Sequence, residues 1–372
     1  MKLFINELKK LFILFRTDPR AILAGIIAPT AILIIFAITF GNFKPFSVSI
    51  INQDQGNMGL ILKQEILQQI SPLENKAYFQ DMKLDKETAV KKYQSGELLG
   101  VIIIPQDFSA KFQNSQNPRI EYYLNNYNTD LAKNMRLYLQ EGILAFYQRY
   151  TPAKALEIEE IFTVQRQVHW FNIIATGVFL LAVLIGGMFS FLYLLFKEKS
   201  YGTLLEYQLA PVSPLASFNA RLLFSLFMAV ITGTFNGILI YLMTGMNLLT
   251  GLEYIIIPLL FTAIFYISFA AIFALYLNNF AGAAVGSMVI AVLLWFMSGG
   301  LVSTKGATGI IKIISYLIPN RYALEIIRDN LFSMQVYNLT FNYLILTLFA
   351  AVSLFAAVKV YKRKLWIYEK YR

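Results

Sequence analysis

The chain has 372 residues, of which 57% are hydrophobic and 15% are charged, and its formal net charge is +10. Soluble domains carry about 25% charged residues, so this composition excludes a disordered protein and an ordinary soluble enzyme. It indicates that much of the chain faces lipid. The absence of cysteine excludes disulfides and thiolate chemistry, and the single histidine, His169, excludes a metal site built from two histidines of one chain.

Six stretches are long and apolar enough to cross a bilayer as helices of roughly 17–25 residues. None of them contains Asp, Glu, Lys, Arg or His. A charge at the centre of a spanning helix costs at least ~2.5–3.5 kcal/mol, so this depletion predicts a multi-pass membrane protein. The predicted spans are residues 21–40, 171–196, 222–243, 255–277, 283–302 and 341–358.

The basic residues predict which way the chain crosses the membrane. Fourteen Lys and Arg residues fall in 1–20, 197–221 and 359–372, against four in the loops expected on the opposite side. Lysine and arginine are retained on the cytoplasmic face, so both termini are expected there. Residues 45–170, with thirteen basic and fourteen acidic residues, are expected outside, and the first span is interpreted as uncleaved.

Residues 45–170 have the composition of a small soluble domain inserted between the first two spans. Strand patterns over 46–51, 99–104 and 120–124 alternate with amphipathic stretches over 59–70, 86–94 and 107–113. This order predicts an α/β or α+β layer. From Thr129 the spacing becomes helical as far as Pro152, and these helices are interpreted as a stalk, with an outer gate as the alternative.

Several kinds of active site are missing from the sequence. No glycine is followed by lysine, which excludes a P-loop, and no G-x-S-x-G serine elbow is present. His169 lies in a His-Trp-Phe run and is interpreted as part of an interfacial aromatic belt. Because the spans lack ionisable groups, a transported solute would draw its energy from another subunit.

Two further segments have a pattern of their own. Residues 197–221 form a short, charged, amphipathic connection suited to docking a partner at the cytoplasmic face. Residues 303–340 are too polar to span and too apolar for a free loop. Their apolar stripes predict two short helices hinged at Pro319, with Arg321 and Glu325 spaced for an i,i+4 pair.

With these segments the sequence resembles the ABC type-2 permeases of bacterial exporters, in the branch with a large extracytoplasmic domain between spans one and two. Four motifs carry the resemblance, and their order and spacing cover essentially the whole chain. They are VSIINQD (48–54), GELLGVIIIPQDF (96–108), KEKSYGTLLE followed by PVSP (197–214) and PNRYALEIIR (319–328).

The resemblance implies an α-helical polytopic membrane protein of the bacterial cell membrane with domains 1–44, 45–170 and 171–372. It implies a non-enzymatic permease that exports drugs or lipid-like compounds. This permease would pair with a second permease, which is either an identical copy or a sister protein. ATP and magnesium would be bound by a separate ATPase subunit, and this chain itself would hold no cofactor or metal.

The implied residues for coupling to the ATPase are Glu198, Gly202, Thr203, Leu204 and Glu206. Those of the outer re-entrant segment (303–340) are Pro319, Arg321, Tyr322 and Arg328. Spans two and five would line the route, with Thr176, Asn236, Trp295 and Ser298 as candidates for contact.

Three other interpretations remain open from the residues alone. A membrane-anchored receptor or scaffold would use the inserted domain for binding and would need no ATPase. A sodium-coupled carrier would need coordinating polar groups at the membrane midplane, and few are present. An intramembrane enzyme would need catalytic side chains that the spans do not supply. Asn236 and Ser298 are interpreted first as partners in helix–helix hydrogen bonds.

Overall fold

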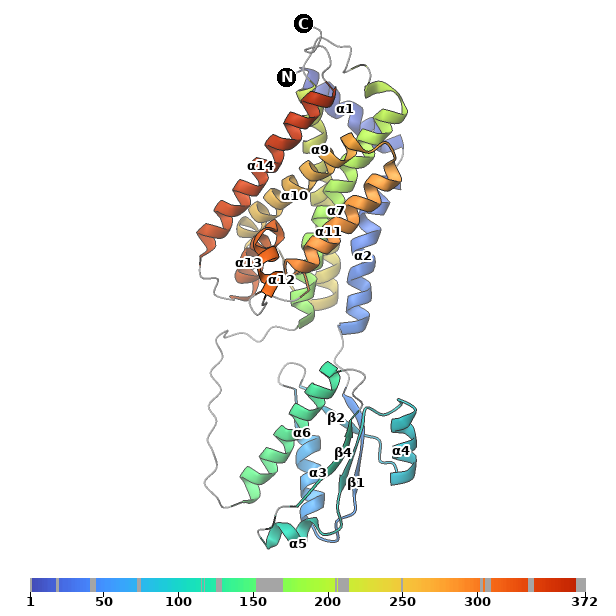
Figure 1. The fold of residues 1–372 in the computed structure, drawn as a ribbon, viewed down its shortest axis with the longest axis vertical. Coiled ribbons are helices and arrows are strands. Elements are labelled where there is room, and N and C mark those ends of the chain that lie inside the picture. The colour runs from blue at the N-terminus through green and yellow to red at the C-terminus, as the bar shows by residue number, and fades with distance from the viewer. Residues whose placement is uncertain are drawn as a thin grey trace. The chain divides into compact units, whose positions relative to one another are not determined.

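The chain separates into two compact units, Met1–Gly41 with Thr163–Arg372, and Asn42–Phe162. The computed structural model describes residues 2–17, 20–40, 45–71, 75–114, 116, 118–124, 129–151, 170–204, 206, 214–248, 250–301, 304, 309–333 and 338–365. His169 lies outside the described residues. Figure 1 shows the helices and strands of each unit.

The smaller unit, referred to below as the α/β unit, is a four-stranded sheet between helices. Its strands are β1 (Phe46–Asn52), β2 (Phe79–Asp81), β3 (Gly100–Ile104) and β4 (Glu121–Leu124), in the order β2-β1-β3-β4. β1 lies parallel to β2 and β3, and β4 lies antiparallel to β3 at the edge of the sheet. The helices are α3 (Met58–Gln68), α4 (Lys86–Gln94), α5 (Phe108–Gln113) and α6 (Thr129–Tyr150).

The two faces of this sheet are covered unequally. Ile50, Ile102 and Ile104 pack with buried residues of α3, α5 and α6, whereas Val101 and Ile103 pack on the smaller cluster around α4. Figure 1 shows α4 on the opposite side of the strands from α3 and α6. This division follows from the alternation of side chains along a strand.

The sequence pattern located most of these elements. The predicted strands over 46–51, 99–104 and 120–124 correspond to β1, β3 and β4, and the three amphipathic stretches correspond to α3, α4 and α5. Strand β2 was not predicted, because its three residues, Phe-Gln-Asp, are too few to show an alternating pattern. It is nevertheless a parallel neighbour of β1.

Asp54 joins three elements of the α/β unit at the carboxyl end of β1. Its carboxylate accepts hydrogen bonds from the Gly59 amide at 2.9 Å, from the Ser109 amide at 3.0 Å and from the Ser109 hydroxyl. The Ser109 oxygen in turn accepts from the Met58 amide at 2.9 Å. The 48–54 motif is thus bonded to the residue that follows the 96–108 motif, and the Gln53 amide also donates to the Ile104 carbonyl at 3.0 Å, so two motifs far apart in the sequence meet here.

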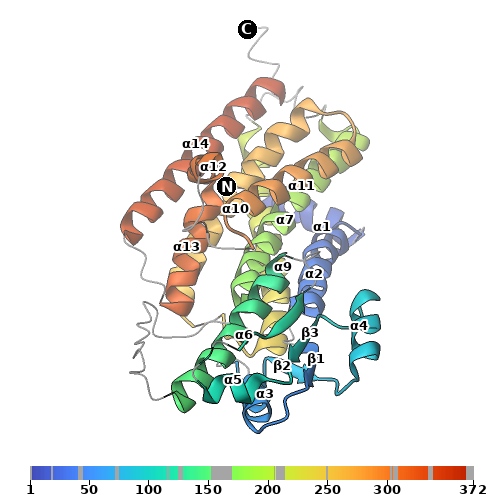
Figure 2. The same ribbon diagram turned by 60° about the horizontal axis from the view of Figure 1, so that its bottom comes forward.

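The larger unit is a bundle of helices. It contains α1 (Lys2–Thr17), α2 (Arg20–Phe40), α7 (Trp170–Ser200), α9 (Leu215–Thr244), α10 (Leu252–Tyr276), α11 (Phe280–Met297), α12 (Gly309–Tyr316), α13 (Pro319–Phe332) and α14 (Leu339–Leu365). Among the described residues, α7, α9, α10, α11 and α14 are long and apolar enough to cross a membrane, and α2 contributes the shorter apolar stretch Gly25–Thr39. In both views α2 and α13 lie on opposite sides of α7 (Figures 1 and 2).

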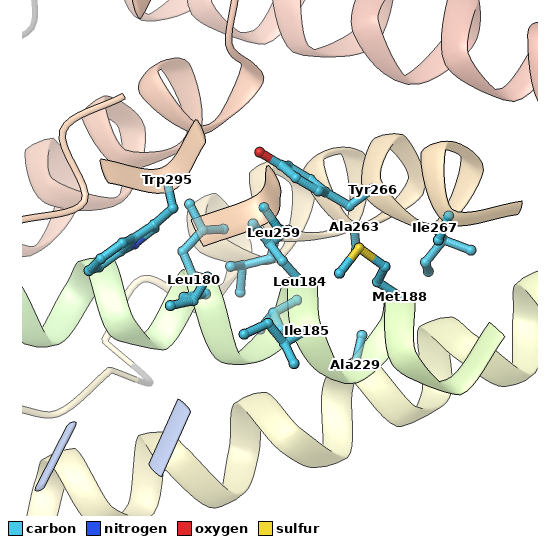
Figure 3. Packing of buried hydrophobic residues seen from close by; sticks show 14 of the residues in the cluster. Leu180, Leu184, Ile185, Met188, Ala229, Leu259, Ala263, Tyr266, Ile267 and Trp295 are labelled. Atoms are coloured by element: carbon cyan, nitrogen blue, oxygen red, sulfur yellow. The ribbon is translucent and has the colours of Figure 1, made fainter. Parts of the chain in front are cut away.

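Helix α7 forms the centre of this bundle. Of its apolar stretch, 89% is buried, against 17% for α14 and 28% for α11. Figure 3 shows Leu180, Leu184 and Met188 of α7 between side chains of neighbouring helices. Gly186 lets α9 approach closely, because a Cβ there would overlap the Thr232 side chain. The helices at the periphery direct large apolar side chains outward, as lipid-facing helices do.

One predicted boundary is wrong. The fifth span was expected to run to residue 302, but α11 ends at Met297. The Gly300 amide donates to the Trp295 carbonyl at 2.9 Å, and Gly299 adopts a positive φ of 98°. The apolar residues Leu301 and Val302 extend the hydropathy signal, but Gly299-Gly300 turns the chain out of the helix.

The arrangement around Asp54 predicts a pH-dependent stability of the α/β unit. Burial alone would raise the pKa of Asp54, but hydrogen bonds from Ser109 and Gly59 outweigh it and hold the pKa below the ordinary 3.8. A lowered folded-state pKa means that the stabilisation is complete above about pH 4 and is lost as the pH falls through the folded-state pKa.

Replacing Asp54 with alanine should weaken this turn by about 2 kcal/mol, because two backbone amides lose their acceptor. Hydrogen exchange of the full chain at neutral pH should then show amides at the start of α3 exchanging about 30-fold faster. Asp107→Ala is the control, since that half-exposed carboxylate forms a surface pair with Lys111 and its loss should change exchange little. Equal exchange in Asp54→Ala and the parent chain would contradict the assignment.

Candidate functional site

The predicted functional residues gather at the two ends of helix α7. Thr176 lies near its start and Glu198 near its end, about 33 Å apart at 1.5 Å per residue. Both side chains are fully buried. A buried polar group is costly unless it is bonded, so the partners at each end show what these residues do.

At the Ser200 end, Glu198 is the hub of a group that we call the Glu198 cluster: Lys10, Glu198, Ser217, Arg221 and Tyr361. The Glu198 carboxylate lies 2.8 Å from the Lys10 ammonium and forms a second ion pair with Arg221. Arg221 also donates to the Tyr361 hydroxyl, which lies 3.3 Å from Ser217 Oγ. The cluster joins α1, α7, α9 and α14.

Burial of the Glu198–Arg221 pair predicts that the cluster tolerates the loss of either partner poorly. Glu198 and Arg221 are both 0% exposed. Removing one partner from a buried ion pair leaves an uncompensated charge and costs about 3–5 kcal/mol. The cluster therefore specifies how the four helices meet.

The two lysines beside Glu198 bind other helices. Lys197 Nζ donates to Tyr193 Oη at 2.9 Å and to the Leu14 carbonyl at 3.3 Å, near the end of α1. Lys199 Nζ donates to the carbonyls of Leu277 at 2.9 Å and Ala274 at 3.2 Å, at the end of α10. A cation at a helix C-terminus satisfies carbonyls that have no partner within the helix. Three successive charged residues thus secure α7 to α1, α9 and α10.

The chain after α7, which we call the α7–α9 segment (residues 201–214), begins with a tight turn. Of this segment, 201–204, 206 and 214 are described. Gly202 has a φ of 71°, a conformation that favours glycine. Thr203 Oγ1 then donates to the Glu198 carbonyl at 3.2 Å. Leu204 is 6% exposed and packs in the main core, whereas Glu206 is exposed.

The five predicted coupling residues therefore occupy two environments. Gly202 and Glu206 lie at the surface, where a partner protein can reach them. Glu198 and Leu204 are buried, so they support the segment rather than present a surface. Thr203 lies between the two groups, bonded back to α7.

At the Trp170 end of α7, Arg328 of α13 makes a dense set of hydrogen bonds. Its guanidinium donates to Thr176 Oγ1 at 3.0 Å and to the Ile173 carbonyl at 3.0 Å, both on α7. It also donates to the carbonyls of Gly299 at 2.8 Å and Gly300 at 3.1 Å. We call these residues, with Trp295, the Arg328 cluster. It connects α7, α13 and the turn after α11.

Trp295 adds a second connection in the same place. Its Nε1 donates to the Gly177 carbonyl at 2.7 Å. A Cβ at Gly177 would overlap the Gly300 carbonyl oxygen, so the helix and the turn touch backbone to backbone. Ser298 Oγ donates to the Trp295 carbonyl at 2.9 Å and caps the end of α11.

The predicted hinge at Pro319 is present between α12 and α13, where Pro319 begins α13. Arg321 Nε lies 3.2 Å from Glu325 Oε1, which forms the expected i,i+4 pair. The same guanidinium stacks over the Tyr316 ring at 3.8 Å, and Tyr322 Oη donates to the Tyr316 carbonyl at 2.7 Å. These contacts join the two short helices firmly.

The four residues considered for the transport route are all bonded within the chain. Thr176, Trp295 and Ser298 belong to or adjoin the Arg328 cluster. Asn236, on α9, donates to the Thr232 carbonyl at 3.1 Å and lies 3.4 Å from the Thr30 hydroxyl of α2. For Thr176, Trp295 and Asn236 these bonds favour the interpretation as helix–helix hydrogen-bond partners, whereas Ser298 bonds within its own helix.

Sequence reasoning missed Lys10, Arg221 and Tyr361 as parts of a site. Lys10 lies on α1, an amphipathic helix whose Leu11 packs against Phe224 and Met228 of α9. The recurrence of apolar residues every three or four positions from Leu3 to Phe15 would have indicated this helix. Charge counting for orientation treated Lys10 and Arg221 as part of a basic collar, without partners.

A model of the family described as "ABC-2 family transporter protein" matches residues 21–359. The chain belongs to the ABC-2 transporter family. No curated protein and no solved structure matches it in these comparisons. Membership implies the permease component of an ABC transporter, a multi-pass membrane protein that works with an ATPase partner.

The geometry of the Arg328 cluster predicts that this arginine cannot be replaced by lysine. Arg328→Lys retains the charge but offers three donors on one nitrogen, which cannot reach acceptors on two elements. We expect a loss of about 2–4 kcal/mol, because buried carbonyls lose a charged donor.

Thermal unfolding of the detergent-purified chain would show this loss as a lowered midpoint. Arg16→Lys, at an exposed position of α1, is the matched control and should leave the midpoint unchanged. A midpoint for Arg328→Lys equal to that of the control would refute the role given to the guanidinium.

Proposed function

We propose that this ABC-2 permease is an exporter subunit that moves an amphipathic or lipid-like compound out of the cell. The observation that carries this proposal is the family match across residues 21–359, which takes in both units. Spans without ionisable residues support the absence of ion coupling within this chain. Under this proposal ATP and magnesium are bound by the separate ATPase subunit.

The docking place that we propose for the ATPase is the α7–α9 segment. Its exposed residues include Tyr201, Gly202 and Glu206, while Leu204 anchors it in the bundle. Because α7 is buried along most of its length, a displacement of this segment acts on the whole bundle. A segment on a peripheral helix such as α14 would lack this effect.

The orientation follows the distribution of basic residues. We place both termini and the α7–α9 segment in the cytoplasm, and the α/β unit outside a bacterial cell membrane. The apolar faces of α11 and α14 are then available to lipid or to a second permease, identical or a sister. On α14 this face consists of Phe341, Leu344, Leu348, Val352 and Phe355.

The first experiment is affinity purification of the chain from detergent-solubilised membranes with a tag at the C-terminus. Recovery of an ATPase that carries a P-loop supports the proposal, and a second permease in the same eluate establishes the dimer. Recovery of this chain alone, under conditions that keep a known ABC exporter intact, supports instead a receptor or scaffold that binds partners through the α/β unit.

Glu206→Lys should uncouple ATP hydrolysis from transport while leaving the fold intact, because the exposed charge is reversed at the docking surface. We expect the ATPase stimulation by the permease to fall about tenfold, which corresponds to about 1.4 kcal/mol. Glu253→Lys reverses another exposed charge, at the start of α10, and serves as the control. Unchanged stimulation in Glu206→Lys would remove this residue from the docking surface.

A further inference from the structure

We propose that Lys10, Arg221 and Tyr361 are positioning residues of the α7–α9 segment, acting through Glu198. This inference rests on the proposed function, because the segment is the proposed docking place of the ATPase. It assigns a role to helix α1 and to the end of α14.

The Glu198 side chain is fixed from three helices. Lys10 of α1 and Arg221 of α9 pair with its carboxylate, and Tyr361 of α14 accepts a hydrogen bond from Arg221. Tyr361 and Arg221 are both 0% exposed. Glu198, Arg221 and Tyr361 each limit where the others can lie, because burial leaves them no water as an alternative partner. Lys10, whose side chain is 34% exposed, reaches the same carboxylate from the edge of the bundle.

The turn at the start of the α7–α9 segment is hydrogen-bonded to the backbone of residues 197–199. The amides of Tyr201 and Gly202 donate to the carbonyls of Lys197 at 3.0 Å and Lys199 at 3.1 Å. Thr203 Oγ1 donates to the carbonyl of Glu198 itself. The position of the Glu198 residue thus determines the position of the turn, and with it the burial of Leu204.

Two members of the Glu198 cluster lie beyond the part of the chain that the family model matches. Lys10 and Tyr361 both lie outside the matched residues 21–359. The two ends of the chain therefore supply contacts to the part of the permease that the family shares. From this geometry α1 and α14 hold the docking place in its working position.

The absence of cysteine makes the test direct, because a single introduced cysteine reports on one position. In the full-length, detergent-purified chain, Leu204→Cys places a thiol where the side chain is 6% exposed. Its reaction with a polar maleimide should be slow. Tyr201→Cys, at a position 63% exposed, gives the fast reference rate, and Leu248→Cys, 6% exposed elsewhere in the bundle, reports on general loosening.

Lys10→Met and Tyr361→Phe each remove one contact and leave the Glu198–Arg221 pair in place, so the chain keeps its fully buried ion pair. We expect labelling of Leu204→Cys to accelerate at least about tenfold in Lys10→Met and by about threefold in Tyr361→Phe. Leu248→Cys should keep its slow rate. Lys10→Arg should restore protection, because it retains the cation.

Two control substitutions isolate the contact with Glu198. Lys9→Met removes a neighbouring, exposed lysine of α1. Glu7→Gln removes the other carboxylate that lies 2.8 Å from Lys10, within the same helix. Both should leave Leu204→Cys protected. Unchanged labelling in Lys10→Met and Tyr361→Phe, or equal acceleration in Lys9→Met, would overturn the positioning role.

A second measurement relates this positioning to transport. In the purified complex, Lys10→Met should retain the ATPase subunit but lower its stimulation about tenfold. Full stimulation together with an exposed Leu204→Cys would overturn the functional part of the inference. If purification recovers no ATPase, the proposed function fails, while the labelling rates still decide whether these residues position the segment.

Discussion

A helix that is buried on all sides has no water to satisfy its polar groups, and this constraint governs the larger unit. Helix α7 carries Thr176 near its start and Glu198 near its end, and both side chains require partners from the rest of the chain. Arg328 donates a hydrogen bond to Thr176, and Lys10 and Arg221 form ion pairs with Glu198. Because these partners come from distant parts of the sequence, the ends of α7 determine which helices stand beside it. The apolar middle then needs only complementary shape.

The same principle operates on a smaller scale in the α/β unit. The Asp54 carboxylate accepts hydrogen bonds from two backbone amides and a hydroxyl at the end of a strand. These bonds fix the start of α3 against α5. Here, however, water is close, and the effect is a lowered pKa rather than a fully buried ion pair. In both places a carboxylate is held by donors that come from different elements of the fold.

Much of this architecture follows from local pattern. Hydropathy located the long apolar helices because length and the absence of charge are properties of each segment alone. For the same reason alternation located β1, and a short run of β-branched residues located β3. The Glu198 cluster could not be located in this way, because its charged members are spread from Lys10 to Arg221 and look like ordinary flanking residues. Pairing is a property of tertiary structure. Likewise, Gly177 and Gly300 carry no sign in the sequence that they touch, and Trp295 resembles any apolar residue until its indole N–H meets a carbonyl.

The ion pair between Lys10 and Glu198 has a consequence for the synthesis of the chain. At about 5–20 residues per second, Arg221 leaves the ribosome some ten to forty seconds after Lys10. During that interval α1 has been made, but the carboxylate that receives its lysine, and the arginine beside it, have not both arrived. Helix α1 therefore depends on two later helices for this site, because the ion pairs can form only after α7 and α9 have both been made.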